Sequence, residues 1–395
     1  MKKLLALVLS AIMVLSLCSC GEGGKTDGVK MGFICLHDEN STYDLNFINA
    51  AKEACEKLGI EYIIKTNIPE GQECYETAGE LVDAGCNIVF ADSFGHEDYM
   101  IEVAKEYPEV QFLHATGTKA HTENLKNYHN AFASIYQGRY LAGVAAGMKL
   151  NEMIANGEIT ADQCKVGYVG AFTYAEIISG YTSFFLGVRS ECPSATMEVT
   201  FTSSWYDETA EKEGAVKLIE DGCVLISQHA DSMGAPTACE AAGVPNVSYN
   251  GSTASVAPNT FIVSSKIDWA PYFEFCINAV KEGKEIPADY TGTLDTGSVK
   301  LTELGGAAAA GTAEKLEEVK KQLSDGTLHV FDASTFTVGG ENLSSYMADV
   351  DTDAAYTPDH EVILNGYFNE SGDGFRSAPY FDIQIDGITL LDTAF

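Results

Sequence analysis

The stretch VKMGFICLHDENSTYDLNFINAAKEACEKLGIEYIIK, residues 29–65, contains a complete strand–helix–strand unit. Val29 to Leu36 is a short apolar run typical of a buried strand. Asn46 to Leu58 repeats apolar residues at helical spacing and ends at Gly59, a residue suited to the left-handed position after a helix. Ile60 to Lys65 is the next strand. Two strands joined by one helix lie parallel in a sheet, so the stretch predicts an α/β fold.

The same alternation continues in two series, the first ending near His114 and the second running from Val166 to Tyr249. Strands separated by helices predict parallel sheets covered on both faces, so we expect two doubly wound lobes joined by a hinge. We expect the chain to cross between them near Asn130 to Gln137, near Val263 to Lys266, and after Gly283. The predicted parts are residues 29–132 with 264–290 for lobe 1, 133–263 for lobe 2, and 291–395 for a C-terminal extension with added strands at Tyr380–Ile385 and Ile388–Leu391.

The N-terminus has the pattern of a bacterial lipoprotein signal. Lys2 and Lys3 precede the apolar run Leu4 to Leu17, which is too short to span a bilayer comfortably. Small Ser19 stands directly before Cys20, as at a lipoprotein cleavage site. We therefore predict a signal peptide at 1–20, lipid attachment at Cys20 and a glycine-rich flexible tether at 21–28. The alternative is an ordinary cleaved signal, and both alternatives place the folded part outside the cytoplasmic membrane.

The composition excludes one class of partner. The chain has 24 Lys and Arg against 57 Asp and Glu, a net charge of −33, and no basic stripe, so nucleic acid is not an expected partner. The 11 cysteines are scattered, without a CxxC pair or a metal-type spacing. We interpret the nine beyond the signal mainly as small buried apolar residues.

Polar and aromatic side chains follow the predicted strands in both series. The carboxyl ends of parallel strands meet at one edge, where ligands of doubly wound sheets bind. Aromatic rings can stack on a flat heterocycle while amides and carboxylates bond to its edge. One such ring could simply pack beneath a loop, but four at equivalent positions favour a site. The sequence predicts a small heterocyclic ligand, with no metal or cofactor, bound by Asn40, Tyr43, Asp44, Phe94, Phe172, Trp205, His229, Asp231 and Asn250.

Enzyme motifs are weak in this chain. Asp38, Glu39 and Asp44 could act as acid and base, but solvated loop carboxylates are far more common. His229 and Asp231 lack a nucleophilic serine in a strained turn. We find neither GxGxxG after the first strand nor GxxxxGK[ST], so no dinucleotide or nucleotide-hydrolysing site is predicted.

Five motifs resemble those of one known family: NSTYD at 40–44, VAKEYPEVQF at 103–112, YLAGVAA at 140–146, KVGYVG at 165–170 and WYD at 205–207. The family is the basic-membrane-protein (BMP) family of ABC-transporter substrate-binding lipoproteins, and the resemblance covers most of residues 30–283. It implies a type I periplasmic-binding-protein-like fold, a purine nucleoside or base as ligand, and an ABC permease as membrane partner. It also implies a lipid-anchored location on the extracytoplasmic face. Tyr43 stands where the family has a stacking Phe.

The chain departs from the family at one ligand position. Nucleoside-binding relatives have an Asp near Asn250, whereas this chain has Asn250-Gly251-Ser252, with no carboxylate for ribose hydroxyls. We therefore expect the free base to bind as well as, or better than, its nucleoside. Asp38, Asp44 or Asp231 could supply a carboxylate from elsewhere in the chain. Two other functions remain open: a membrane-anchored nucleoside or glycoside hydrolase, and a ligand-sensing ectodomain.

Overall fold

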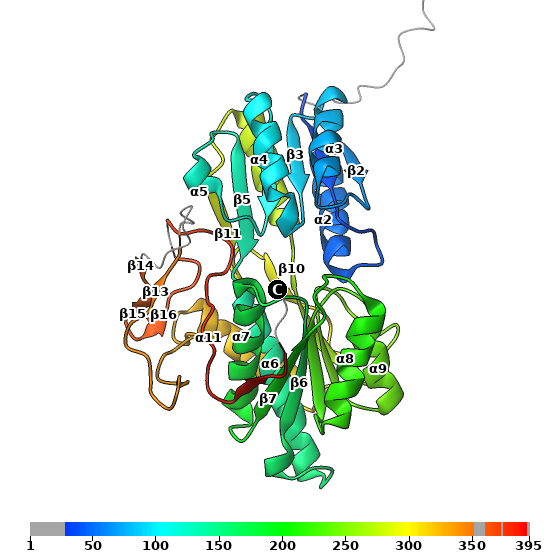
Figure 1. Ribbon diagram of the computed structural model, residues 1–395, viewed down its shortest axis with the longest axis vertical. Coiled ribbons are helices and arrows are strands. Elements are labelled where there is room, and N and C mark those ends of the chain that lie inside the picture. The colour runs from blue at the N-terminus through cyan, green and yellow to red at the C-terminus, as the bar shows by residue number, and fades with distance from the viewer. Residues whose placement is uncertain (1–27, 351–359, 373, 393–395) are drawn as a thin grey trace, which may run out of the picture.

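The computed structural model describes residues 28–350, 360–372 and 374–392, and the predicted signal, Cys20 and all of the predicted tether except Gly28 lie outside them. The chain forms two α/β lobes, one above the other in Figure 1, each built on its own sheet. The predicted fold class is confirmed. A C-terminal extension runs along one side of both lobes (Figure 1).

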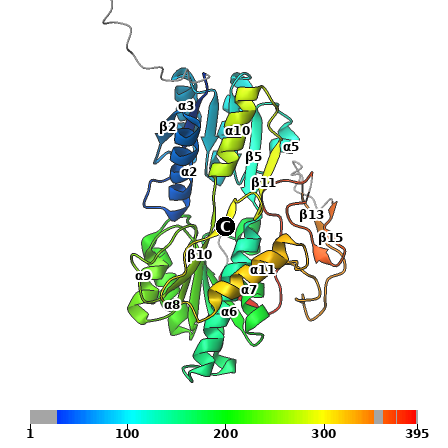
Figure 2. The ribbon, with the colours of Figure 1, turned by 180° about the vertical axis from the view of Figure 1, so that it is seen from behind.

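Lobe 1 is built on a six-stranded sheet in which every neighbouring pair is parallel, in the order β11-β5-β4-β3-β1-β2. Helices α2 and α10 cover one face and α3 and α4 the other, as Figures 1 and 2 show from opposite sides. Both faces are buried, which explains the continuous apolar runs of the strands. The elements are β1 (Lys30–Ile34), α2 (Thr42–Leu58), β2 (Glu61–Lys65), α3 (Gln72–Asp83), β3 (Ile88–Ala91), α4 (Glu97–Glu106), β4 (Gln111–Ala115), α5 (Ala120–Glu123), β5 (Tyr128–Ala133), α10 (Ala270–Glu282) and β11 (Asp289–Gly292).

Lobe 2 is built on a seven-stranded sheet in the order β12-β10-β9-β8-β6-β7-β17, parallel except for β12. Helices α6 and α7 pack on one face, and α8 and α9 on the other. The elements are α6 (Ile135–Ala155), β6 (Lys165–Gly170), α7 (Ala175–Glu191), β7 (Thr196–Phe201), α8 (Glu208–Glu220), β8 (Leu225–His229), α9 (Gly234–Ala242), β9 (Asn246–Tyr249), β10 (Phe261–Ile267), β12 (Val299–Leu301), α11 (Thr312–Ser324) and β17 (Ile388–Leu390).

Three segments join the lobes, and they are hydrogen-bonded to one another. The Ser134 amide donates to the Gly292 carbonyl at 2.8 Å, and the Asp268 amide to the Ser298 carbonyl at 2.7 Å. The expected boundary between residues 263 and 264 falls inside β10, so the second crossing follows Ile267 instead. The strand was hard to recognise because polar Ser264 and Ser265 are fully buried in it.

The C-terminal extension covers the α6 and α7 side of lobe 2. Its helix α11 packs on α6, and β17 pairs in parallel with β7 at the sheet edge. The predicted strand at Ile388–Leu391 is therefore present as β17, but Tyr380–Ile385 is not a strand. That segment alternates buried and exposed residues as a strand would, but it pairs with no strand of the described residues. Its apolar side chains pack on the core of lobe 2, where the Phe381 ring stacks on Phe331 with centroids 4.1 Å apart. Four short strands complete the extension: β13 (Met347–Ala348), β14 (His360–Glu361), β15 (Ile363–Leu364) and β16 (Tyr367–Phe368).

Two helices begin earlier than their apolar patterns suggested. Helix α2 starts at Thr42 rather than Asn46. The apolar pattern from Gly180 to Arg189 predicts the second helix, which is α7 and starts at Ala175. Their first turns carry polar residues that break the apolar period, and Ser41 caps α2 by accepting from the Asp44 amide. These turns face the space between the lobes. All nine cysteines in the described part of the chain are buried and unpaired.

Candidate ligand-binding site

A cavity lies between the two lobes at the carboxyl ends of their strands. It contains about 370 Å³ of space not filled by protein atoms, part of which is open to solvent. Its walls are Leu36, His37, Tyr43, Asp44, Ser93, Phe94 and Thr116 from lobe 1, with Glu176, Trp205, His229, Asp231 and Asn250 from lobe 2.

The first turn of α2 holds a buried carboxylate against the cavity. Asp44 accepts a hydrogen bond from the His37 amide at 2.8 Å and another from the Ser41 hydroxyl at 2.5 Å. Burial raises the pKa of Asp44, but the hydrogen bonds from His37 and Ser41 outweigh it and hold the pKa below its usual value. Asp44 therefore carries a negative charge at the positive end of the helix.

A second carboxyl group, Asp92, lies behind the first. It is fully buried, and burial together with the charge of Asp44 raises its pKa well above the usual value. Its main-chain carbonyl accepts from the Tyr43 hydroxyl at 2.7 Å, which fixes the Tyr43 side chain. Cys35, Asp44 and Asp92 place ligand-type atoms within 4.8 Å of one another. The opposite pKa directions make Asp92 the protonated and Asp44 the ionised member of this pair.

Aromatic rings from both lobes meet at the cavity. Trp205 lies edge-on to Phe172, with centroids 4.9 Å apart, and Phe172 stacks on Tyr174 at 5.2 Å. Tyr174 in turn stacks on Phe94 of lobe 1 at 5.3 Å. Phe94 and Trp205 line the cavity, whereas Phe172 packs between Trp205 and Tyr174.

Lobe 2 contributes polar groups that are nearly all buried. His229 Nε2 lies 3.4 Å from Glu176 Oε1, and burial lowers the pKa of His229, which keeps the ring neutral. Burial, and then the charge of Asp44, raise the pKa of Asp231 well above its usual value. The buried side chain of Asn250 interacts with the Asp231 carboxyl group, and this contact lowers the pKa of Asp231 in opposition to burial.

Thr116 stands at the end of β4 in an unusual conformation. Its φ is 64°, a left-handed value that is rare for a β-branched residue. Its hydroxyl is buried and finds no partner in the part of the chain that the structure describes. Backbone strain of this kind concentrates at functional sites, and here it turns a hydroxyl toward the cavity.

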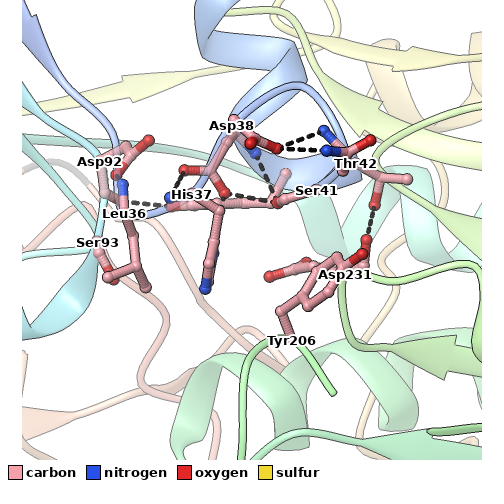
Figure 3. A network of polar contacts seen from close by, with 12 residues as sticks. Leu36, His37, Asp38, Ser41, Thr42, Asp92, Ser93, Tyr206 and Asp231 are labelled. Atoms are coloured by element: carbon pink, nitrogen blue, oxygen red, sulfur yellow. Dashed lines mark hydrogen bonds and ion pairs between the residues drawn. The ribbon is translucent and has the colours of Figure 1, made fainter. Parts of the chain in front are cut away.

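Direct contacts close the lobes over the cavity. The Thr42 amide donates to the Asp231 carbonyl at 3.0 Å, and the Thr42 hydroxyl donates to the same carbonyl at 3.3 Å (Figure 3). The Asn46 side chain donates to the Asn250 carbonyl at 2.9 Å. These bonds join the start of α2 to the ends of β8 and β9. These contacts are typical of a closed form, and hinge opening of the lobes would widen access to the cavity.

Comparison with known proteins identifies the family. Residues 34–328 match the model of the PnrA-like ABC transporter substrate-binding proteins. The chain belongs to this family. The resemblance inferred from the five motifs is thereby confirmed.

Individual relatives agree with the family. A purine-binding protein of Brucella abortus is 30% identical over 317 residues, covering 79% of this chain and 85% of the relative. A protein of Haloferax volcanii, named for glucose binding by an ABC transporter, is 29% identical over 287 residues, covering 73% and 69%.

Solved structures show the same fold. A solute-binding protein of an ABC transporter system from Conexibacter woesei has a TM-score of 0.63 at 20% identity, covering 76% of this chain and 98% of its own. One from Aeropyrum pernix has a TM-score of 0.65 at 15% identity, covering 79% and 94%. In the described residues, no helix is both long and apolar enough to cross a membrane.

The structure brings most, but not all, of the predicted site residues of this substrate-binding protein together. Asn40 is exposed and bonds to Asp38 at the surface, because it precedes the first turn of α2. Phe172 lies behind Trp205. The others line the cavity: Tyr43, Asp44, Phe94, Trp205, His229, Asp231 and Asn250.

Five residues that line the cavity are absent from the predicted set: Leu36, His37, Ser93, Thr116 and Glu176. Thr116 follows β4 directly, so the rule that polar residues at strand ends form the site could have found it. Glu176 lies in the first turn of α7, before the start of the predicted helix. An acidic residue in the first turn is a usual signal for the start of a helix, but this signal does not indicate that the side chain lines a cavity.

Proposed function

We propose that this protein binds a purine base or nucleoside between its lobes, outside the cytoplasmic membrane, and delivers it unchanged to an ABC permease. The observation that carries the proposal is one inter-lobe cavity lined by rings from both lobes and by buried edge-binding groups. Tyr43 and Phe94 come from lobe 1 and Trp205 from lobe 2. Flat, partly apolar rings are the ligands that such aromatic walls favour.

The polar groups favour a ligand with several hydrogen-bond donors. Asp44 and Glu176 are acceptors when ionised, and the Thr116 hydroxyl offers an unpaired donor. Ring N–H groups, exocyclic amines and sugar hydroxyls would meet the acceptors. A phosphate would lie beside these carboxylates, so the charge of the cavity disfavours nucleotides.

The argument that a free base binds better than its nucleoside is weakened. It rested on the missing carboxylate at Asn250-Gly251-Ser252, but Asp44, Glu176 and Asp231 reach the cavity from other elements. Hydroxyl acceptors are therefore available, and base and nucleoside belong together in the proposed ligand class.

Titration calorimetry tests the proposal. We expect binding of adenine, guanine, hypoxanthine or their nucleosides, with D-glucose as the competing ligand class. Asn40→Ala, at an exposed position outside the cavity, is the control and should leave affinity unchanged. Chromatography of the ligand after long incubation should show no product, which would set aside the hydrolase alternative. Binding of glucose without any purine would overturn the purine assignment.

We also propose that Cys20 carries a lipid anchor. The support is the lipoprotein-type cleavage pattern and the glycine-rich tether, which would hold a binding protein near its permease. Cys20→Ala should move the protein from the membrane fraction to the soluble fraction, whereas Cys18→Ala should leave it membrane-bound. A signal-processed Cys20→Ala variant that stays on the membrane would contradict the anchor.

A further inference from the structure

A second cavity adjoins the first, and the C-terminal extension forms one of its walls. It contains about 860 Å³ of unfilled space, open in part to solvent. Phe94, Thr116 and Glu176 line both cavities, so the two lie side by side. The remaining lining residues are Thr118, Tyr174, Ala175, Asp349, Arg376, Ala378, Pro379 and Asp382. We call this space the second chamber.

Its outer wall lies beyond the part of the chain that matches the family model, which ends at residue 328. Hydrogen bonds hold that wall in place. Buried Glu370 accepts from the Ser179 hydroxyl of α7 at 2.6 Å and from the amides of Tyr380 and Phe381 at 3.0 and 2.8 Å. On the other side, the Ser377 amide and hydroxyl both donate to Asp289 of lobe 1 at 2.6 Å. The chamber is therefore a built feature of this chain.

Arg376 is the one cation among the residues that line the chamber. The residue is only 8% exposed. Its Nη2 donates to the Pro379 carbonyl at 3.0 Å, and its Nη1 lies 3.8 Å from Asp349 Oδ2. Its Nε is buried and has no partner among the described residues. A buried guanidinium with a free N–H is costly unless a ligand oxygen accepts from it.

The other lining groups define which ligand oxygens would fit. Glu176, Asp349 and Asp382 accept hydrogen bonds, while Arg376 and Thr116 donate them. Three carboxylates against one guanidinium disfavour a phosphate or a carboxylate. Hydroxyl groups can both donate and accept, so a polyhydroxylated, uncharged group matches this set. The stacked rings of Phe94 and Tyr174 offer an apolar face beside it.

We infer that the second chamber binds an uncharged, hydroxyl-bearing part of the ligand, a sugar ring attached to the heterocycle, and that Arg376 donates to one of its oxygens. The inference rests on the proposed function, because the heterocycle occupies the first cavity. It assigns the C-terminal extension a direct part in ligand specificity.

Calorimetry on two variants tests the chamber. Arg376→Gln removes the charge and the free N–H, and Ala175→Leu fills the space from α7 without touching Arg376. Both should weaken adenosine and inosine binding by at least about tenfold, the effect of losing one hydrogen bond to a charged group. Adenine and hypoxanthine should change by less than about twofold. Lys320→Gln, at an exposed site on α11, is the control and should bind like the wild type.

Each other outcome overturns one proposal or the other. The chamber is overturned if the two variants lose affinity equally for bases and nucleosides, or lose none for either. It is also overturned if the wild type binds bases but no nucleoside. If Arg376→Gln unfolds in a thermal melt, Ala175→Leu alone decides. If the wild type binds no purine, the proposed function fails, and D-ribose and D-glucose are then titrated. Sugar binding that Arg376→Gln abolishes would retain the chamber, and absence of sugar binding would overturn it too.

Discussion

Trp205 and Phe172 belong to one aromatic cluster, but only Trp205 lines the ligand cavity. A ring that stacks on a base contributes roughly 1–3 kcal/mol to binding. We predict that Trp205→Ala weakens purine binding by about tenfold to a hundredfold, while Phe172→Ala weakens it by less than about fivefold. Calorimetry on both variants gives the comparison. Equal losses would mean that the two rings act only as a packing unit.

Glu370 is a residue whose burial makes stability depend on pH. Burial raises its pKa to about 7, against three hydrogen bonds that lower it. The pKa of Glu370 in the unfolded chain is near 4.5, so below that pH Glu370 is protonated in both the folded and the unfolded state. As pH rises to about 7, only the unfolded state loses the proton, so the stability contributed by protonated Glu370 is lost across this window.

Glu370→Gln should remove this loss, because the amide keeps the same shape and is always neutral. We predict that the stability of Glu370→Gln relative to wild type rises by roughly 2–3 kcal/mol from pH 5 to pH 8. Urea unfolding at both pH values measures it. Exposed Glu53→Gln on α2 is the control and should show little change. A relative stability that falls with pH would show that Glu370 is ionised when folded.

At the scale of elements, α6 and α7 pack backbone to backbone through glycines. A Cβ at Gly187 would overlap the Tyr140 carbonyl, and one at Gly143 would overlap the Phe184 carbonyl. The two helices cover one face of the lobe 2 sheet, and Glu176, in the first turn of α7, lines the cavity. Gly143 of the YLAGVAA motif is therefore required by the close contact between α6 and α7.

Gly187→Ala should therefore destabilise the protein by about 1–3 kcal/mol, because the helices must separate. Gly79→Ala is the matched change in α3, where an added Cβ meets nothing within 4 Å. It should stabilise by about 0.5–1 kcal/mol through helix propensity. Denaturant midpoints of the two variants should shift in opposite directions, and a shared direction would contradict the packing argument.

At the scale of the whole molecule, closure depends on a few bonds between the lobes. Asn46→Ala removes the 2.9 Å bond to the Asn250 carbonyl and should favour the open form of the free protein. We predict a larger radius of gyration without ligand, a purine affinity reduced by about threefold to tenfold, and a wild-type radius at saturation. Small-angle scattering and calorimetry measure these quantities. Asn40→Ala is the surface control, and unchanged values for Asn46→Ala would place closure elsewhere.

The sequence by itself determined the parallel sheets, the family, and the strand ends where ligand groups gather. These features are local, since a strand, a helix and a turn are each encoded within about 20 residues of chain. It also placed Tyr43 and Trp205 beside polar partners, because residues directly after parallel strands share one edge.

Only the tertiary structure decided which of these residues meet. Asn40 lies three residues before Tyr43, which lines the cavity, and Phe172 lies two residues before Tyr174, on which its ring stacks. Neither Asn40 nor Phe172 lines the cavity, because helix phase and loop direction depend on long-range packing. Thr116, Glu176 and Arg376 converge from three distant segments. No local period encodes such a convergence, since it depends on how two lobes and the extension pack. The second chamber is therefore a product of the fold.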